Sequence, residues 1–198
     1  MLFRSEKYFG GETDAIELGA SAGVVSSHII SKFKDNHRRL IGVEANNSLT
    51  KTWYSNVARH NRVGIRATLL TQAIYYGGSS VHFQMSSNTT ESRISESDFT
   101  TQTSLEVKSV SLSNLVKEHK ILCYALFCDI EGAELQIFLN ENSVLENCRQ
   151  IFIELHNSNE GEITYSIDEL NSLIQSKGFT LIDKHGPVCY YKRELCGE

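Results

Sequence analysis

The sequence predicts an α/β domain built on an open, mostly parallel sheet with helices on both faces. Its first 70 residues alternate between short β-branched segments and amphipathic segments, in the order strand, helix, strand, helix, strand. Residues 122–128 are nearly all apolar, which is typical of a strand covered on both faces. Polar residues directly follow several of the expected strands. The alternation favours parallel strands joined by right-handed crossovers.

The composition is that of an ordinary globular domain. The chain has 198 residues, of which 40% are apolar and 22% charged, and its net charge is −5. A chain of this length buries roughly 70% of its unfolded surface, so it needs no disulfide or metal to fold. The acidic balance predicts no nucleic-acid partner, because such proteins usually carry a basic face. One basic cluster ends in Arg38-Arg39. We interpret it as cations near a helix C-terminus, with a phosphate-binding patch as the alternative.

The cysteines and the termini give further expectations. The five cysteines are odd in number and form no C-x-x-C pair, so we predict neither a disulfide nor a zinc site. No apolar stretch approaches the roughly 18 residues of a membrane span, and residues 1–7 contain no long apolar leader. We therefore expect a cytoplasmic protein without a membrane segment.

The elements of the N-terminal half follow from these patterns. Strands are predicted over residues 15–18, 40–44 and 65–70, with a helix in each interval. Asn47 or Ser48 can cap the second helix. Residues 81–85 alternate like a hairpin strand. Residues 86–104 are rich in Ser and Thr and are predicted to be a mobile loop.

The C-terminal half is more regular. A short helix is expected around residues 112–116. A central strand is expected at 122–128, a helix at 133–139, a buried strand at 150–155 and an antiparallel pair at 179–182 and 188–191. Ser166 followed by Glu169 is a capping box that begins another helix. One domain over residues 1–198 accounts for every element.

Polar residues end four of the predicted strands. They are Glu17 to Gly23, then Glu44, then Asp129 with Glu131, and then Glu154 with His156. Because ligands of open parallel sheets bind at the carboxyl ends of the strands, these positions predict a ligand site at that edge.

The first of these turns indicates the kind of ligand. Residues 19–23 carry Ser21 where the dinucleotide fingerprint G-x-G-x-x-G needs its middle glycine. Glu17 is an unfavourable neighbour for a pyrophosphate but a favourable one for a cation. S-adenosylmethionine carries an ammonium and a sulfonium and no phosphate. Glu44 is suited to accept hydrogen bonds from both hydroxyls of its ribose.

Four ordered motifs resemble those of the FkbM-type methyltransferases. They are Ile16-Glu17-Leu18-Gly19-Ala20-Ser21-Ala22-Gly23, Val43-Glu44-Ala45-Asn46, Asp129-Ile130-Glu131-Gly132-Ala133-Glu134 and Ile153-Glu154-Leu155-His156. The resemblance covers about residues 14–192. It implies a Rossmann-like class I methyltransferase fold, whose seven-stranded sheet has an antiparallel last strand, and it implies S-adenosyl-L-methionine as the cofactor. The family's D-V-G-A-N-x-G appears here with Glu17 and Ser21, and the proline of its F-E-P-N segment is Ala45.

Site residues follow from the resemblance together with the strand ends. The expected cofactor-binding residues are Glu17, Gly19, Ala20, Ser21, Gly23, Glu44, Ala45, Asn46, Gln72, Ala73 and Asp129. The expected catalytic residues are Asp129, His156 and Glu131. Near its reference pKa, His156 would take a proton from a hydroxyl at neutral pH, oriented by a carboxylate such as Glu154. Glu131 and Glu134 would both face the cleft or both cap the following helix.

The sequence thus predicts an S-adenosylmethionine-dependent methyltransferase acting on a hydroxyl of a sugar or small metabolite. An NAD-dependent oxidoreductase of similar topology is one alternative, and a non-catalytic S-adenosylmethionine-binding module is another. Mg²⁺ would need Asp129, Glu131 and Glu134 to face one point, and the sequence offers no further arranged oxygen ligands. We therefore predict no metal.

Overall fold

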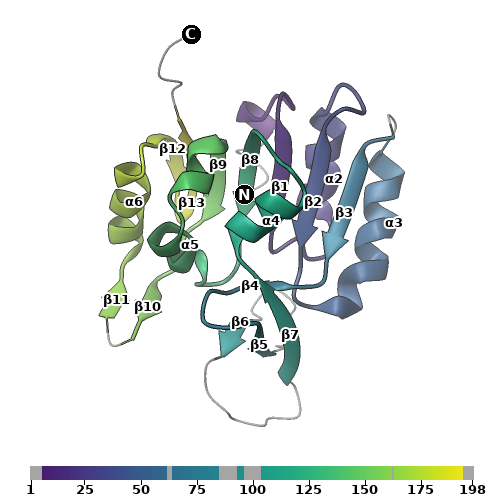
Figure 1. Ribbon diagram of the computed structural model, residues 1–198. Coiled ribbons are helices and arrows are strands. Elements are labelled where there is room, and N and C mark those ends of the chain that lie inside the picture. Colours follow the sequence, from purple (N-terminus) through teal and green to yellow (C-terminus); the bar gives the residue numbers. More distant parts are fainter. Residues whose placement is uncertain (1–5, 62–63, 85–92, 96–103, 162, 194–198) are drawn as a thin grey trace.

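A computed structural model describes residues 6–61, 64–84, 93–95, 104–161 and 163–193. Its centre is a seven-stranded sheet with the strand order β12-β13-β9-β8-β1-β2-β3 (Figure 1). All neighbours in this sheet are parallel except β13, which runs antiparallel to both β12 and β9. The predicted fold class is confirmed, including the antiparallel last strand.

The main elements occur in the predicted order along the chain. The sheet contains β1 (Asp14–Leu18), β2 (Arg39–Val43), β3 (Arg66–Leu70), β8 (Tyr124–Cys128), β9 (Cys148–Glu154), β12 (Thr180–His185) and β13 (Val188–Lys192). The helices are α2 (Val24–Lys32), α3 (Thr50–His60), α4 (Leu112–Glu118), α5 (Glu134–Asn140) and α6 (Ile167–Ser176), with short 3-10 turns η1 (Asn47–Leu49) and η2 (Ser143–Asn147). None of the helices within the described ranges is long and apolar enough to cross a membrane.

The core forms two layers because side chains alternate across the sheet. Ile16 and Leu18 of β1 pack in the layer that includes α4, α5 and α6, whereas Ala15 packs with α2 and α3 on the other face. Every residue of β8 is buried, as predicted for a central strand. The chain passes from β1 outward to β2 and β3 and then returns to β8 on the other side of β1. This reversal places the switch point, where open sheets bind ligands, between β1 and β8.

A second, smaller sheet differs from the prediction. It contains β4 (Ala73–Ile74), β5 (Ser80–Gln84), β6 (Arg93–Ser95) and β7 (Ser104–Val110) in the order β4-β7-β5-β6. In Figure 1 it lies beyond the arrowheads of β2 and β3, at the carboxyl edge of the central sheet. Most of the predicted loop 86–104 lies outside the described residues, but its segment Arg93–Ser95 is a strand that pairs with β5. The prediction failed there because backbone pairing in a hairpin does not require apolar side chains.

Two smaller differences concern local structure. The side chain that caps the turn before α3 belongs to Asn46, whose Oδ1 accepts the Ser48 N–H at 3.1 Å, and not to Asn47 or Ser48. A short hairpin, β10 (Ser158–Glu160) with β11 (Ile163–Tyr165), was not expected. The capping box at the start of α6 is confirmed.

Candidate active site

The turn after β1, residues 19–23, directs its N–H groups into the protein. Those of Gly19 and Ala20 both donate to the carbonyl oxygen of Val43, at 2.9 and 3.0 Å. The N–H of Ser21 donates to Glu44 Oε2 at 2.8 Å. In dinucleotide-binding proteins the pyrophosphate approaches the backbone at the position that Ser21 occupies here and lies at the start of the following helix. Because the Glu44 carboxylate occupies the Ser21 N–H, this position disfavours an anionic ligand.

Two glycines allow this turn to pack closely. Gly19 has φ +80°, and a Cβ there would lie 1.9 Å from the carbonyl oxygen of Asp129. Gly23 has φ +84°, and a Cβ there would lie 2.9 Å from the Trp53 ring. The Asp129 N–H donates to the carbonyl oxygen of Leu18 at 3.0 Å. The loops after β1 and β8 are therefore in direct contact.

Glu44 lies at the end of β2 with its carboxylate held by backbone groups. Oε2 accepts the Ser21 N–H, and Oε1 accepts the Asn46 N–H at 2.8 Å. Burial raises the pKa of Glu44, and the backbone hydrogen bonds from Asn46, Ser21 and Ala45 oppose that shift. The two carboxylate oxygens offer about four lone-pair sites. Because the backbone N–H groups of Asn46, Ser21 and Ala45 use three of them, Glu44 can accept a further hydroxyl group without losing its protein partners.

Glu17 lies apart from the other predicted site residues. It is 3% exposed, and it faces α2 and α3, where the Ser26 hydroxyl donates to its Oε2. Trp53 Nε1–H in turn donates to Ser26 Oγ at 2.7 Å. Burial raises the pKa of Glu17 to about 8, and the nearby Glu44 and Asp129 charges add to the shift. Glu17 is thus held by Ser26 of α2, and its direct contact with a ligand stays a prediction.

The remaining predicted cofactor-binding residues follow β2 and β3. Asn46 is 7% exposed, and its side chain is used in the cap of η1. Ala45 is half-buried against the small sheet. Gln72 is partly exposed between β3 and β4, and Ala73 is buried in β4. All four lie at the same edge of the sheet as Glu44, and their contact with a cofactor stays a prediction.

The loop after β8 places Glu131 and Glu134 in different environments, although we expected the same orientation for both. Glu134 is completely buried, and its oxygens accept the N–H groups of Ile130 at 3.0 Å and Gly132 at 2.9 Å. Glu131 remains about one-third exposed, and its carboxylate faces His156. Glu134 therefore shapes the loop, while Glu131 faces His156.

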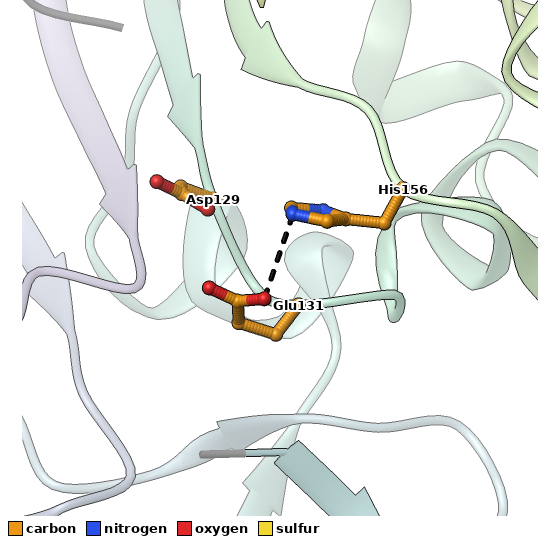
Figure 2. Close-up of side chains that lie close together, drawn as sticks. All are labelled: Asp129, Glu131 and His156. Carbon is orange, nitrogen blue, oxygen red and sulfur yellow. Dashed lines mark ion pairs between the residues drawn. The ribbon is translucent and has the colours of Figure 1, made fainter. Parts of the chain in front are cut away.

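His156 joins this loop from the segment after β9. Its Nδ1 lies 3.1 Å from Glu134 Oε1, and its Nε2 lies 3.5 Å from Glu131 Oε2. Figure 2 shows the His156 ring and the carboxylates of Asp129 and Glu131 around a common space. The carboxylate that orients His156 is therefore Glu134 and not Glu154. The strand ends at Glu154, so the period-two argument no longer applies two residues later.

The charges in this cluster shift the pKa values of His156 and Asp129. The hydrogen bond with Glu134 raises the pKa of His156 from 6.5 to about 9; burial opposes the shift, and the charges of Glu134, Glu131 and Asp129 add to it. Burial raises the pKa of Asp129 from 3.8 to about 6. The negative charges of Glu154 and Glu131 add to this shift, and the charge of His156 opposes it. The expectation that His156 has its reference pKa is wrong, because three carboxylates surround it. At neutral pH it holds a proton.

An acidic carboxyl edge at the switch point of an open α/β sheet defines a Rossmann-like protein with a candidate ligand site at that edge. Residues 17–181 match the Methyltransferase FkbM domain. The chain belongs to this methyltransferase family, as its motifs indicated.

Solved structures share the fold at low sequence identity. A protein of the NADB-Rossmann superfamily from Streptococcus agalactiae is 13% identical, with a TM-score of 0.53 over all of this chain and 69% of that one. Sp1610 from Streptococcus pneumoniae, a putative tRNA (m1A22) methyltransferase in complex with S-adenosyl-L-methionine, is 11% identical, with a TM-score of 0.51 over 100% and 73% of the two chains. Magnesium protoporphyrin IX methyltransferase from Synechocystis PCC 6803, with bound S-adenosylmethionine, is 9% identical, with a TM-score of 0.51 over 98% and 74%. No curated protein sequence matches the chain.

Proposed function

We propose that this protein transfers the methyl group of S-adenosyl-L-methionine to a hydroxyl group of a sugar or a small hydroxylated metabolite. The observation that carries the proposal is the pairing of Glu44 with a first turn whose Gly19, Ala20 and Ser21 N–H groups are already used. Such a site accepts hydroxyl donors and cations and offers little to a phosphate. Membership of the FkbM methyltransferase family supports the same reaction class.

The residues at the carboxyl edge fit this cofactor. Beside its three backbone donors Glu44 keeps a lone pair that can accept a ribose hydroxyl. Asp129, at the end of the central strand, places a carboxylate where a cationic methionine group would lie. Two of the structures with the same fold hold S-adenosylmethionine, which supports the assignment at the level of the fold. When bound, the cofactor supplies a methyl group on a positively charged sulfur.

The protein's own groups then position the acceptor and receive its proton. We place the acceptor hydroxyl beside Asp129, Glu131 and His156, because these side chains face one space at the ends of the two central strands (Figure 2). His156 and Glu131 are the groups that would receive the proton. Since His156 is held protonated by Glu134 and its neighbours, it must first lose its own proton to act as a base.

A methyl-transfer screen tests the proposal. The protein and S-adenosylmethionine are incubated with sugars, glycolipid precursors and small hydroxylated metabolites, and release of S-adenosylhomocysteine is followed. We expect release that depends on one class of hydroxyl acceptor and that falls in Glu44→Ala. Cofactor binding without release for any acceptor would indicate a non-catalytic module. Reduction of NAD in place of methyl transfer would indicate an oxidoreductase.

A further inference from the structure

We propose that Asp129, Glu131 and His156 form a binding site for a divalent transition-metal ion, with Mn²⁺ and Zn²⁺ as the ions of choice. The role given to the ion below rests on the proposed methyl transfer, but the site itself does not. One potential ligand atom from each of the three residues lies within 4.8 Å of the other two. Figure 2 shows the three side chains reaching this space from the β8 loop and from the segment after β9.

The distance between His156 and Glu131 is close to that of two ligands around one ion. With metal–ligand distances of about 2.1 Å, neighbouring ligands lie roughly 3.0–3.4 Å apart in octahedral or tetrahedral geometry. His156 Nε2 and Glu131 Oε2 are 3.5 Å apart. A shift of a few tenths of an ångström would bring both atoms to a common ion.

The imidazole is oriented as in known metal sites. A metal-bound histidine almost always uses its other ring nitrogen to contact a carboxylate or a carbonyl. An ion at Nε2 of His156 takes the place of the proton that the ring carries at neutral pH, and this proton is released to solvent. Here Nδ1 contacts the buried Glu134, whose oxygens also accept the N–H groups of Ile130 and Gly132. Glu134 is therefore fixed from three directions. It holds the ring so that Nε2 faces Asp129 and Glu131.

The local charge also favours a cation. Glu154, Glu131 and Glu134 are all near enough to disfavour the negative charge on Asp129, whereas His156 favours it. A divalent ion would offset the repulsion among these carboxylates.

The donor types select the ion. Mg²⁺ and Ca²⁺ prefer sites made only of oxygen ligands. An imidazole nitrogen suits Zn²⁺ or Fe²⁺, and the two carboxylates also suit Mn²⁺. We predicted no metal because the sequence offers no further oxygen ligands beside Asp129, Glu131 and Glu134. In the structure His156, and not Glu134, lies with Asp129 and Glu131, which changes both the geometry and the preferred ion.

Three protein ligands leave coordination positions open. Under the proposed function these positions face the acceptor, so two neighbouring oxygen atoms of that molecule would fit them. The acceptor class is then a sugar or metabolite with adjacent hydroxyl groups. A hydroxyl oxygen on a divalent ion loses its proton more easily.

Metal titration of the chelator-treated protein tests the site. Isothermal titration calorimetry with Mn²⁺, Zn²⁺ and Mg²⁺ is expected to show one site that binds Mn²⁺ and Zn²⁺ at least tenfold more tightly than Mg²⁺. Asp129→Asn and His156→Ala are each expected to weaken Mn²⁺ binding by about tenfold or more. His60→Ala, at an exposed position at the end of α3, is the matched histidine control and should leave binding unchanged.

Two outcomes would overturn the site. One is the absence of a 1:1 Mn²⁺ complex in a protein that binds S-adenosylhomocysteine, which would leave the proposed function standing. The other is equal Mn²⁺ affinity in wild type, Asp129→Asn and His156→Ala when circular dichroism shows all three folded. Failure to bind S-adenosylhomocysteine, with Mn²⁺ binding intact, would instead remove the proposed function and keep the metal site.

Discussion

Replacing Glu17 with glutamine is expected to stabilise the protein at neutral pH. The Glu17 carboxyl is buried beside Ser26, whose hydroxyl also accepts the Trp53 Nε1–H. The pKa of Glu17 is about 8 in the folded protein against 4.5 for an ordinary glutamate. At pH 7 the folded state must hold a proton that the unfolded state has released. Glutamine is neutral at every pH, has nearly the same shape and can still accept from the Ser26 hydroxyl.

The magnitude follows from the two pKa values. The stability associated with protonated Glu17 is fully present below pH 4.5 and is lost as the pH rises through about 8. The loss amounts to about 3 kcal/mol at pH 7 and about 5 kcal/mol well above pH 8. The variant has no such loss. At pH 7 its melting temperature should therefore exceed that of wild type by roughly 6–12 °C for a domain of this size.

Urea unfolding of both proteins at several pH values between 5 and 9 measures the effect. Other groups contribute to the pH dependence of each protein, but the difference between the two curves isolates Glu17. That difference should widen in favour of the variant as the pH rises. Glu160→Gln, at an exposed position in β10, is the matched control and should give no such trend. Parallel curves for wild type and Glu17→Gln would refute the reasoning.

Three further substitutions probe the turn and the cluster. Gly19→Ala is expected to destabilise the fold, measured by urea unfolding, because its Cβ would meet the Asp129 carbonyl at 1.9 Å and its φ is +80°; stability equal to wild type would contradict the close packing. Asp129→Asn should reduce both S-adenosylhomocysteine affinity and turnover, and an unchanged affinity would remove Asp129 from the cofactor. His156→Ala should keep cofactor affinity by calorimetry and cut turnover by about 10²–10⁴; turnover within a few-fold of wild type would assign the proton to another group.

The central sheet could be predicted because its strands are strongly apolar and regularly spaced. Tyr124–Cys128 has no polar residue exposed on either face, so its central position follows from composition alone. The strand β7 was missed, although Leu105 and Val107 alternate with charged residues and both pack in the small sheet. Its serine- and threonine-rich surroundings concealed that pattern.

The sequence predicts which motifs lie at the candidate site, but it does not predict the contacts between their side chains. The sequence identifies the strand ends, because parallel strands share an edge, and it correctly gathers Asp129, Glu131 and His156 there. It could not assign Glu134 to His156, since that contact depends on how the loop after β8 folds back on its own N–H groups. The burial of Glu17 likewise depends on two helices whose packing the sequence does not specify.

The most direct test of the account is calorimetric binding of S-adenosylhomocysteine and NAD to wild type and Glu44→Ala. Wild type should bind S-adenosylhomocysteine and bind NAD more weakly, because Glu44 and the engaged turn disfavour a pyrophosphate. Hydrogen bonds to a charged acceptor contribute about 1.5–3 kcal/mol each, so Glu44→Ala should lose tenfold or more in S-adenosylhomocysteine affinity. Tighter binding of NAD than of S-adenosylhomocysteine, or an affinity unchanged by Glu44→Ala, would contradict the assignment of this edge as the cofactor site.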